Sequence, residues 1–256
     1  MPLQKWTRLI AAAGCLLAVL GSSPPVQAAE KNPAVDPRAA RILKAALQDL
    51  TAAKSFTFRA EVIKEEPLDS GQRIQNIGIL KTFVRRPDRL AVVRQGEELG
   101  EGNMYYDGKL FTLLNTKENV YGTWKAPATI DALLETIKEN LGFVPPLAAL
   151  LRSDMGSGAR EKEILSATYV GRAEIRGVDC HHLALTGHVV DLQVWVSDGA
   201  PVIKRIVVTF KKAPMTPQFT ATFLDWDFNA HLSDYLFAFS PPPGARKIEF
   251  KVKGKP

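Results

Sequence analysis

Short runs in which apolar and polar residues alternate follow one another along most of the chain. In residues 56–62, for example, Phe56, Phe58, Ala60 and Val62 alternate with polar neighbours. Alternation with a period of two places the apolar side chains on one face of a β-strand. The pattern therefore predicts a mainly β protein in which each strand buries one face.

The strand-like runs number about a dozen, and short turns separate them. Asp107-Gly108 lies between two such runs and is a strong signal for a tight hairpin. We expect the strands to follow in meander order at about residues 56–62, 73–84, 90–94, 104–106, 110–114, 120–124, 168–175, 179–186, 192–197, 202–210, 218–228, 236–239 and 247–252.

One helix is expected before the strands and another between them, because apolar residues there recur every three to four positions. The first helix begins at Asp36, an N-cap followed by Pro37, and ends near Lys54. The second lies in a helical insertion at about 128–152, where Thr129 caps a helix over 130–141.

The apolar face of the second helix carries Leu133, Leu134 and Ile137. Pro127 precedes the helix, and Gly142 follows it as the expected stop. These residues are possible hinges. The insertion is therefore either permanent core packing or a lid over a binding cavity.

The N-terminus has the three-part pattern of a secretory signal peptide. Lys5 and Arg8 precede an apolar run over residues 9–20, and Val26-Gln27-Ala28 supplies small residues for cleavage. The run is shorter than the roughly 20 apolar residues of a membrane span. We expect cleavage after about Ala28 and export to the periplasm.

Two alternatives remain for this N-terminus. One is an uncleaved membrane anchor. The other is a lipoprotein modified at Cys15, because the residues before Cys15 resemble a lipidation box. The apolar run continues past Cys15, which favours the signal peptide at residues 1–28 over lipidation.

Residues 29–256 are expected to form a single domain without a disulfide. Cys180 is the one cysteine left after cleavage, so the core alone has to stabilise the fold. Loss of Lys5 and Arg8 leaves 31 basic and 27 acidic residues, a net charge of +4. No dense basic patch alternates with aromatic residues, so nucleic-acid binding is not expected. We expect a monomer.

Motifs of common enzyme classes are missing from the sequence, including the Gly-x-Ser-x-Gly elbow and the His-Glu-x-x-His helix. One weaker pattern is Cys180 with His182, which share a strand face and which His188 could join at a metal. The favoured interpretation is a half-buried Cys and His in a sheet. We therefore expect no catalytic residue, no metal and no cofactor.

A second weak pattern is the pair Asp225 and Asp227, which share a strand face and could serve as the two acids of a glycosidase. Solvated strand acids are the favoured interpretation. The alternation of apolar and polar residues is irregular over 218–228. This irregularity indicates a possible bulge and leaves open which face of the strand is exposed to solvent.

Basic residues gather around one turn, at Arg85, Arg86, Arg89 and Arg94. They are either an exposed strand end or a surface for lipid head groups or a partner protein. For the second interpretation, the expected contact residues are Arg85, Arg86 and Arg89.

Large apolar side chains are numerous for one curved sheet. These side chains either pack in the hydrophobic core or, in a more specific hypothesis, line a cavity that the two apolar helices cover. The candidates for cavity or lid are Phe56, Phe58, Tyr106, Phe111, Trp124, Leu133, Leu134, Ile137, Phe143, Trp195, Phe219 and Phe223.

Four segments in order resemble the LolA/LolB-like superfamily of periplasmic lipoprotein carriers: RRPDRLAVV (85–93), YYDGKLFTLLNTKENVYGTW (105–124), GVDCHHLAL (177–185) and DYLFAFSPPPGARKIEF (234–250). The nearest resemblance is to a predicted periplasmic branch, domain of unknown function 2092. The resemblance implies an open, strongly curved antiparallel half-barrel covered by an N-terminal helix and a mid-chain helical insertion.

The resemblance also implies a ligand class, the acyl chains of lipoproteins or lipids. We therefore expect a non-enzymatic periplasmic carrier or sensor that binds such a ligand in a sheet-lined cavity, with envelope membrane proteins as possible partners. The alternative is an envelope protein–protein interaction or stress-sensing module with no ligand. A third possibility is a hydrolase or metal-binding protein.

Overall fold

The computed structural model describes residues 35–96, 102–141, 145, 147–155 and 164–249. All of them belong to one compact unit, Pro33–Pro256. The expected signal peptide at residues 1–28 lies outside the described residues. Among the helices that are described, none combines the length and the apolar character that a membrane span requires.

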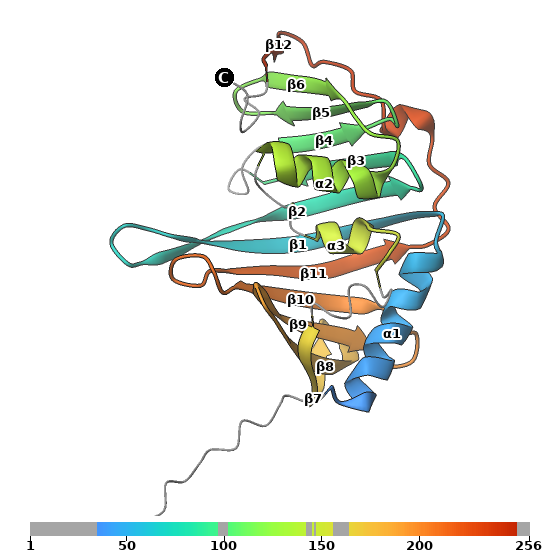
Figure 1. Cartoon of the computed structure of the whole chain (residues 1–256), viewed down its shortest axis with the longest axis vertical. Helices are drawn as coiled ribbons and strands as arrows, with labels where there is room; N and C mark the ends of the chain where they lie inside the picture. Colours follow the sequence, from blue (N-terminus) through green and yellow to red (C-terminus); the bar gives the residue numbers. More distant parts are fainter. Residues whose placement is uncertain (1–34, 97–101, 142–144, 146, 156–163, 250–256) are drawn as a thin grey trace, which may run out of the picture. The chain divides into compact units, whose positions relative to one another are not determined.

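The described residues form twelve strands, three α-helices and a short 3₁₀ helix (Figure 1). The helices are α1 (Pro37–Ala52), α2 (Ile130–Leu141), α3 (Ala148–Leu151) and the 3₁₀ helix η2 (Asp234–Leu236). The strands are β1 (Ser55–Pro67), β2 (Arg73–Arg85), β3 (Arg89–Gln95), β4 (Gly102–Tyr106), β5 (Leu110–Asn115), β6 (Val120–Lys125), β7 (Ile164–Ile175), β8 (Val178–Gly187), β9 (Val190–Ser197), β10 (Ile203–Phe210), β11 (Gln218–Asp227) and β12 (Arg246–Lys247).

All twelve strands belong to one sheet, in the order β12-β6-β5-β4-β3-β2-β1-β11-β10-β9-β8-β7. Neighbouring strands are antiparallel except β12 and β6, which are parallel. The expected meander order holds within β1–β6 and within β7–β11. Between these halves the chain crosses to the far edge of the sheet, so that β1 pairs with β11.

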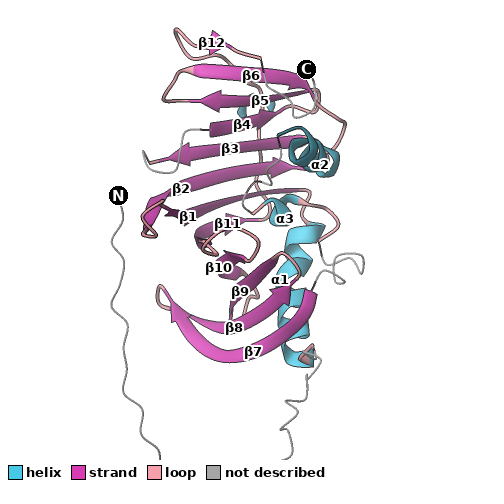
Figure 2. Cartoon of the chain, turned by 60° about the vertical axis from the view of Figure 1, so that its left-hand side comes forward, coloured by secondary structure: helices cyan, strands magenta, loops and turns pink. Residues whose placement is uncertain are grey.

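The sheet is open and curved, and the three α-helices lie on its concave face (Figure 2). Helix α1 packs against β7 and β9, whereas α2 and α3 lie over the other half and the middle of the sheet (Figure 1). This arrangement confirms the predicted mainly β half-barrel with an N-terminal helix and a mid-chain helical insertion.

Both long helices begin as the sequence predicts. The carboxylate of Asp36 accepts a hydrogen bond of 2.7 Å from the backbone N–H of Arg38, and proline follows the cap. The hydroxyl of Thr129 accepts a 3.2 Å hydrogen bond from the N–H of Ala132 at the start of α2. Each helix buries one apolar stripe against the concave face.

The main core lies on this concave face. Strand β1 crosses the middle of the sheet, and its inward side chains Phe56, Phe58, Ala60 and Val62 are at most 3% exposed. Burial of such side chains drives the folding of a chain that has no disulfide among its described residues.

Strand β11 carries a bulge where the sequence pattern is irregular. Arg59 of β1 pairs with Asp225, but the next residue, Ala60, pairs with Phe223, so Leu224 is the extra residue. The bulge brings Trp226 to the same face as Phe223, and their rings stack at 4.7 Å. Asp225 and Asp227 therefore point outward and are exposed.

The C-terminal segment differs from the prediction. Residues 236–239 do not form a strand, since the backbone turns at η2, and the expected strand 247–252 is limited to β12, with 250–252 outside the described residues. The phenyl ring of Phe239 packs against Tyr105 at 5.5 Å and Tyr121 at 4.9 Å, on the convex face. Three consecutive prolines follow, and they lack the N–H that pairs one strand with the next. This apolar segment therefore packs across the convex face without joining the sheet, and we call residues 232–245 the C-terminal strap.

Candidate functional site

A cavity of about 450 Å³ lies between the concave face of the sheet and the helical insertion. Its size is within the range of about 300–1,000 Å³ typical of small-molecule sites. The lining residues are Phe58, Val62, Lys64, Leu80, Thr82, Leu90, Val92, Arg94, Gly102, Met104, Leu113, Leu134, Ile137, Pro145, Leu147, Leu151 and Phe219.

The floor of the cavity comes from the inward positions of β1–β5 and β11. Strand alternation puts Leu90, Val92 and Arg94 on the same face of β3, and Val92 pairs with Met104 of β4. The roof consists of Leu134 and Ile137 of α2, together with Leu147 and Leu151 at α3. Strands far apart in sequence therefore share one apolar chamber.

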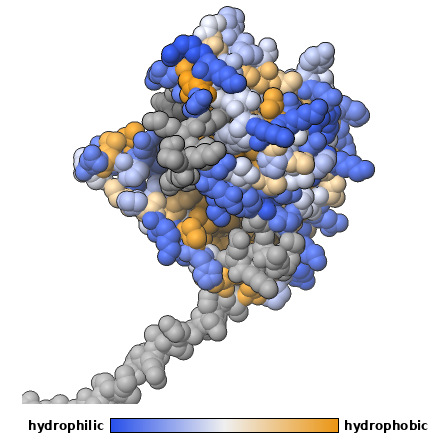
Figure 3. Space-filling model, turned by 45° about the horizontal axis from the view of Figure 1, so that its top comes forward, coloured by the Kyte–Doolittle hydropathy of each residue, from blue (hydrophilic) through white to orange (hydrophobic). Residues whose placement is uncertain are grey.

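On the face shown in Figure 3, hydrophilic side chains predominate and apolar surface is confined to patches and a recessed area between them. Within the cavity lining, Lys64 and Arg94 are the two charged residues. Lys64 lies 3.9 Å from a carboxylate oxygen of Glu66, and its side chain is 55% exposed. It therefore marks the solvent side of the cavity.

The side chain of Arg94 lies in more apolar surroundings than that of Lys64. Burial lowers the pKa of its guanidinium group. Among the residues that the structure describes, none forms an ion pair with this side chain. A Cβ added to Gly102 would lie 3.3 Å from Cδ1 of Leu113 and 3.8 Å from an Nη of Arg94, so a side chain at this position would crowd Leu113 and approach the cation.

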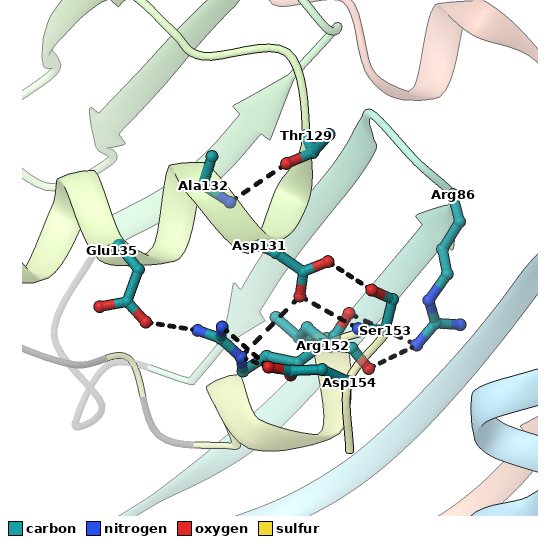
Figure 4. Close-up of polar contacts among 9 residues, drawn as sticks. Arg86, Thr129, Asp131, Ala132, Glu135, Arg152, Ser153 and Asp154 are labelled. Atoms are coloured by element: carbon teal, nitrogen blue, oxygen red, sulfur yellow. Dashed lines mark hydrogen bonds and ion pairs between the residues drawn. The ribbon is translucent and has the colours of Figure 1, made fainter. Parts of the chain in front are cut away.

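A polar cluster around Arg152 ties α2 to the residues that follow α3 (Figure 4). The guanidinium group of Arg152 donates to Glu135 at 2.6 Å and to Asp154 at 2.8 Å. Ser153 donates from its hydroxyl to Asp131 at 2.6 Å. The hydrogen bond to Asp154 is the main cause of the raised pKa of Arg152. These contacts make the insertion one connected unit.

Arg86 joins this unit to α1. Its guanidinium group donates to the backbone carbonyls of Leu50 and Ala53 in and after α1, and to those of Leu151 and Arg152 at α3. The same group lies 4.9 Å from the ring centre of Phe56. Burial lowers the pKa of Arg86, and the nearby charge of Asp131 opposes that shift.

Residues 39–251 match the family described as "Predicted periplasmic protein (DUF2092)". The match covers most of the chain. The protein belongs to this family. A comparison with curated proteins finds no match.

Several solved structures resemble the DUF2092 protein at low sequence identity. The Mycobacterium tuberculosis lipoprotein LppX is 12% identical, with 77% of this chain and 100% of that chain covered and a TM-score of 0.48. An uncharacterized conserved protein from Thermus thermophilus is 9% identical, with 83% and 99% covered and a TM-score of 0.46. A LolA superfamily protein from Nitrosomonas europaea is 11% identical, with 78% and 97% covered and a TM-score of 0.40.

Four of the side chains that the sequence singled out for a cavity or lid do line the cavity of the DUF2092 protein: Phe58, Leu134, Ile137 and Phe219. Five more, Phe56, Tyr106, Phe111, Leu133 and Phe223, are buried in the core beside it and do not line it. Phe143 lies outside the described residues.

Tyr106 shows what these neighbouring core residues do. Its hydroxyl donates a hydrogen bond of 2.6 Å to the carbonyl of Pro127, at the beginning of the helical insertion. Burial raises the pKa of Tyr106 to about 12. Trp124 is half-buried and packs on Phe111 with ring centres 4.6 Å apart. These contacts support the cavity wall from behind.

Trp195 requires a correction. It alternates with the buried residues Val194 and Val196 and therefore points to the convex face. There its ring stacks on His182 at 4.1 Å, and the guanidinium group of Arg205 lies 5.5 Å from it. Trp195 therefore does not contribute to this cavity.

Arg85 and Arg89 hold the C-terminal segment. Arg85 donates to the carboxylate of Asp234 and, at 2.9 Å, to the carbonyl of Leu232. Arg89 lies 3.6 Å from the same carboxylate of Asp234 and 2.8 Å from that of Asp88. Arg85, Arg86 and Arg89 thus have partners inside the chain, and their expected contact with head groups or a partner protein stays a prediction.

The two weak chemical patterns are not assembled into sites among the described residues. No group of three or more His, Cys, Asp or Glu side chains there could hold a metal ion. Cys180 is fully buried, and burial raises the pKa of its thiol. Asp225 is exposed and pairs with Arg59 at 3.0 Å.

The candidates from the sequence did not include the aliphatic lining residues of β2–β5, among them Leu80, Leu90 and Met104. These side chains are aliphatic, whereas the candidates on the strands were all aromatic. Their signal was present, because they occupy the inward phase of the alternation in each strand. Arg94 was grouped with the other arginines of its turn, although its strand position sets it apart.

Proposed function

We propose that this protein is a non-enzymatic periplasmic carrier or sensor that binds an acyl-bearing hydrophobic ligand, a lipoprotein or a lipid. The observation that carries the proposal is the mainly apolar cavity of about 450 Å³ between sheet and insertion. If a methylene group occupies about 30 Å³, the volume of a water molecule in the liquid, this cavity holds about 15 methylene groups, which corresponds to one acyl chain.

The energetics of acyl-chain burial agree with transport or sensing. Each buried methylene contributes about 0.8 kcal/mol, and a lipid bilayer provides a similar gain. The free-energy change for moving an acyl chain between the bilayer and the cavity is therefore close to zero. The main requirement is a cavity that can open, and a short insertion such as α2 and α3 meets it.

The polar cluster of Arg152 holds α2 and the residues after α3 together as one unit. Its contacts with Glu135 and Asp154 run along the insertion instead of into the sheet. Since Arg86 bonds the carbonyls of Leu151 and Arg152, the α3 end of this unit is anchored, and the movement we propose is that of α2 about this end. We propose that Phe58, Leu134, Ile137 and Phe219 contact the acyl chain directly, with the neighbouring buried rings as support.

The decisive experiment is native mass spectrometry of the protein purified from its own periplasm. We expect a monomer with a co-purified lipid or lipopeptide, or uptake of a fluorescent fatty acid by the empty protein. A ligand-free mass together with no uptake of fatty acid contradicts the proposal.

Matched variants connect the uptake to the cavity. Leu134→Trp fills the roof and should abolish uptake, whereas Leu134→Met conserves the volume and should retain it. Val92→Phe narrows the floor from the opposite side and serves as a second blocking variant. Unchanged uptake in folded Leu134→Trp and Val92→Phe would place any binding elsewhere.

The alternative, a protein–protein or stress-sensing module without a ligand, would use the charges of Arg85, Arg86 and Arg89. Each of these already has partners within the chain, which leaves less free charge for another protein. The ligand-binding function is therefore the better supported of the two.

A further inference from the structure

One charge in the cavity stands out because nothing in the described chain neutralises it. Arg94 lies on the inward face of β3, next to Val92, and lines the same space as Phe58 and Leu134. The other cation of the lining, Lys64, has Glu66 and solvent beside it. Within the described residues Arg94 has no carboxylate partner, and burial keeps its guanidinium group from full hydration.

A cation in such a place is costly unless an anion joins it. Removing a guanidinium group from water without a partner destabilises the charged form, and the lowered pKa of Arg94 reflects that cost. Arginine nevertheless stays protonated at neutral pH. Because Arg94 lines the cavity of about 450 Å³, an anionic group that enters the cavity can reach the guanidinium.

The position of Arg94 gives the cavity a polar end and an apolar end. Arg94 is the second-last residue of β3, and Gly102 begins β4, so both lie at the same end of these strands. Leu90 lies four residues earlier in β3, toward the end of the strand where the Arg86 contacts fix the helices. The lining is thus arranged as an amphiphile is, with a charge at one end of an apolar stretch.

We propose that Arg94 binds the acidic head group of an amphiphile whose acyl chain fills the cavity. This inference rests on the proposed function and specifies its ligand class: a single-chain amphiphile with an oxyanion head, either carboxylate or phosphate. The planar guanidinium group matches both, because it donates two parallel hydrogen bonds to a pair of oxygens. A neutral or cationic amphiphile of the same length would leave Arg94 unpaired.

The test compares amphiphiles that share a 16-carbon chain and differ in the head group. Hexadecanoate, hexadecyl phosphate, hexadecanol and hexadecyltrimethylammonium are each measured by equilibrium dialysis against the purified protein, below their aggregation concentrations. We expect at least one of the two oxyanions to bind 10-fold or more tightly than hexadecanol, and the ammonium to bind least. The ratio between hexadecanoate and hexadecyl phosphate distinguishes a carboxylate from a phosphate head.

Three variants assign the preference to Arg94. Arg94→Gln should reduce the preference for oxyanion over alcohol to less than threefold while hexadecanol binding stays within twofold. Arg94→Lys keeps the charge and should retain part of the preference. Arg41→Gln removes an exposed cation from α1 and should leave the preference unchanged. Circular dichroism and thermal melting verify that each variant is folded.

The possible outcomes distinguish a failure of the head-group inference from a failure of the proposed carrier or sensor function. If the wild type binds oxyanion and alcohol equally, and Arg94→Gln does the same, the cavity binds chains and the head-group inference is wrong. Equal loss of all amphiphiles in folded Arg94→Gln, with no recovery in Arg94→Lys, also overturns it, because Arg94 would then only shape the cavity. If the wild type binds none of the four amphiphiles, the proposed function fails as well.

Discussion

The guanidinium group of Arg86 donates a hydrogen bond of 2.8 Å to the backbone carbonyl of Ala53, the C-cap residue that follows α1. The same side chain donates at 3.0 Å to the carbonyl of Arg152, the C-cap residue that follows α3. The last carbonyls of a helix lack partners within the helix. One side chain therefore satisfies the ends of two helices that the sequence places far apart.

Removal of this side chain should destabilise the whole fold. Arg86→Met leaves several partly buried carbonyls without donors, and we expect a loss of about 3 kcal/mol in the free energy of unfolding. Urea denaturation measures the loss, and Arg41→Met, an exposed change in α1, is the control. A loss equal to that of Arg41→Met would mean that water replaces Arg86 without cost.

A charge on the inner face of α2 should affect the ligand more than the fold. If α2 is a mobile lid, the carboxylate of Leu134→Asp reaches water when the lid opens. We then expect a folded variant that is modestly less stable and no longer retains ligand. The measurements are thermal melting and the release rate of a fluorescent fatty acid.

Leu50→Asp is the matched control, because Leu50 of α1 is 1% exposed and belongs to the permanent core. It should lose several kcal/mol and unfold. Global unfolding of Leu134→Asp as well, or hydrogen exchange in α2 as slow as in the central strands, would contradict the lid.

The attachment of the C-terminal segment should weaken in acid. The hydrogen bond from Arg85 and the charge of that group hold the pKa of Asp234 below its ordinary value of 3.8. Because the folded state lowers this pKa, the contribution to stability is complete above pH 3.8 and is lost as the pH falls through the lower folded-state value. The melting temperature of the wild type should therefore exceed that of Asp234→Asn at pH 7, with the difference disappearing in strong acid. A difference that stays constant down to pH 2 would show that the charge of Asp234 has no role.

The thiol of Cys180 should be almost inert in the folded protein. It is fully buried, and its raised pKa keeps the reactive thiolate scarce. We expect native protein to react with a thiol reagent at pH 8 roughly tenfold or more slowly than urea-unfolded protein. Ala200→Cys, which adds a thiol on an exposed turn, should react quickly. Fast native labelling of Cys180 would mean that the sheet opens near β8.

The number of thiols that react in the unfolded protein shows whether the N-terminal segment has been cleaved. Cleavage after Ala28 removes Cys15, so the unfolded exported protein should contain one thiol per chain. Two thiols would indicate that the first 28 residues are retained. N-terminal sequencing of the exported protein provides the independent measurement, with Ala29 as the expected first residue.

Strand alternation was enough to predict the approximate positions of β1–β11 and the inward face of strands such as β1. Phe58 and Val62 line the cavity as the period of two predicts, and Asp36 and Thr129 cap their helices. These features depend on contacts between residues close in sequence, where backbone geometry alone decides which side chains share a face. Local pattern also indicated the irregularity of β11.

Only the tertiary structure decided which strands and side chains meet. The pairing of β1 with β11, the outward side of Trp195 and the folding of the C-terminal strap over the convex face depend on long-range packing. Arg86 and Arg94 look alike in the sequence and are eight positions apart, one in the turn between β2 and β3 and the other in β3. One ends up among helix carbonyls and the other faces an apolar cavity, because the sheet and the helices around them, and not their own neighbours in sequence, set their surroundings.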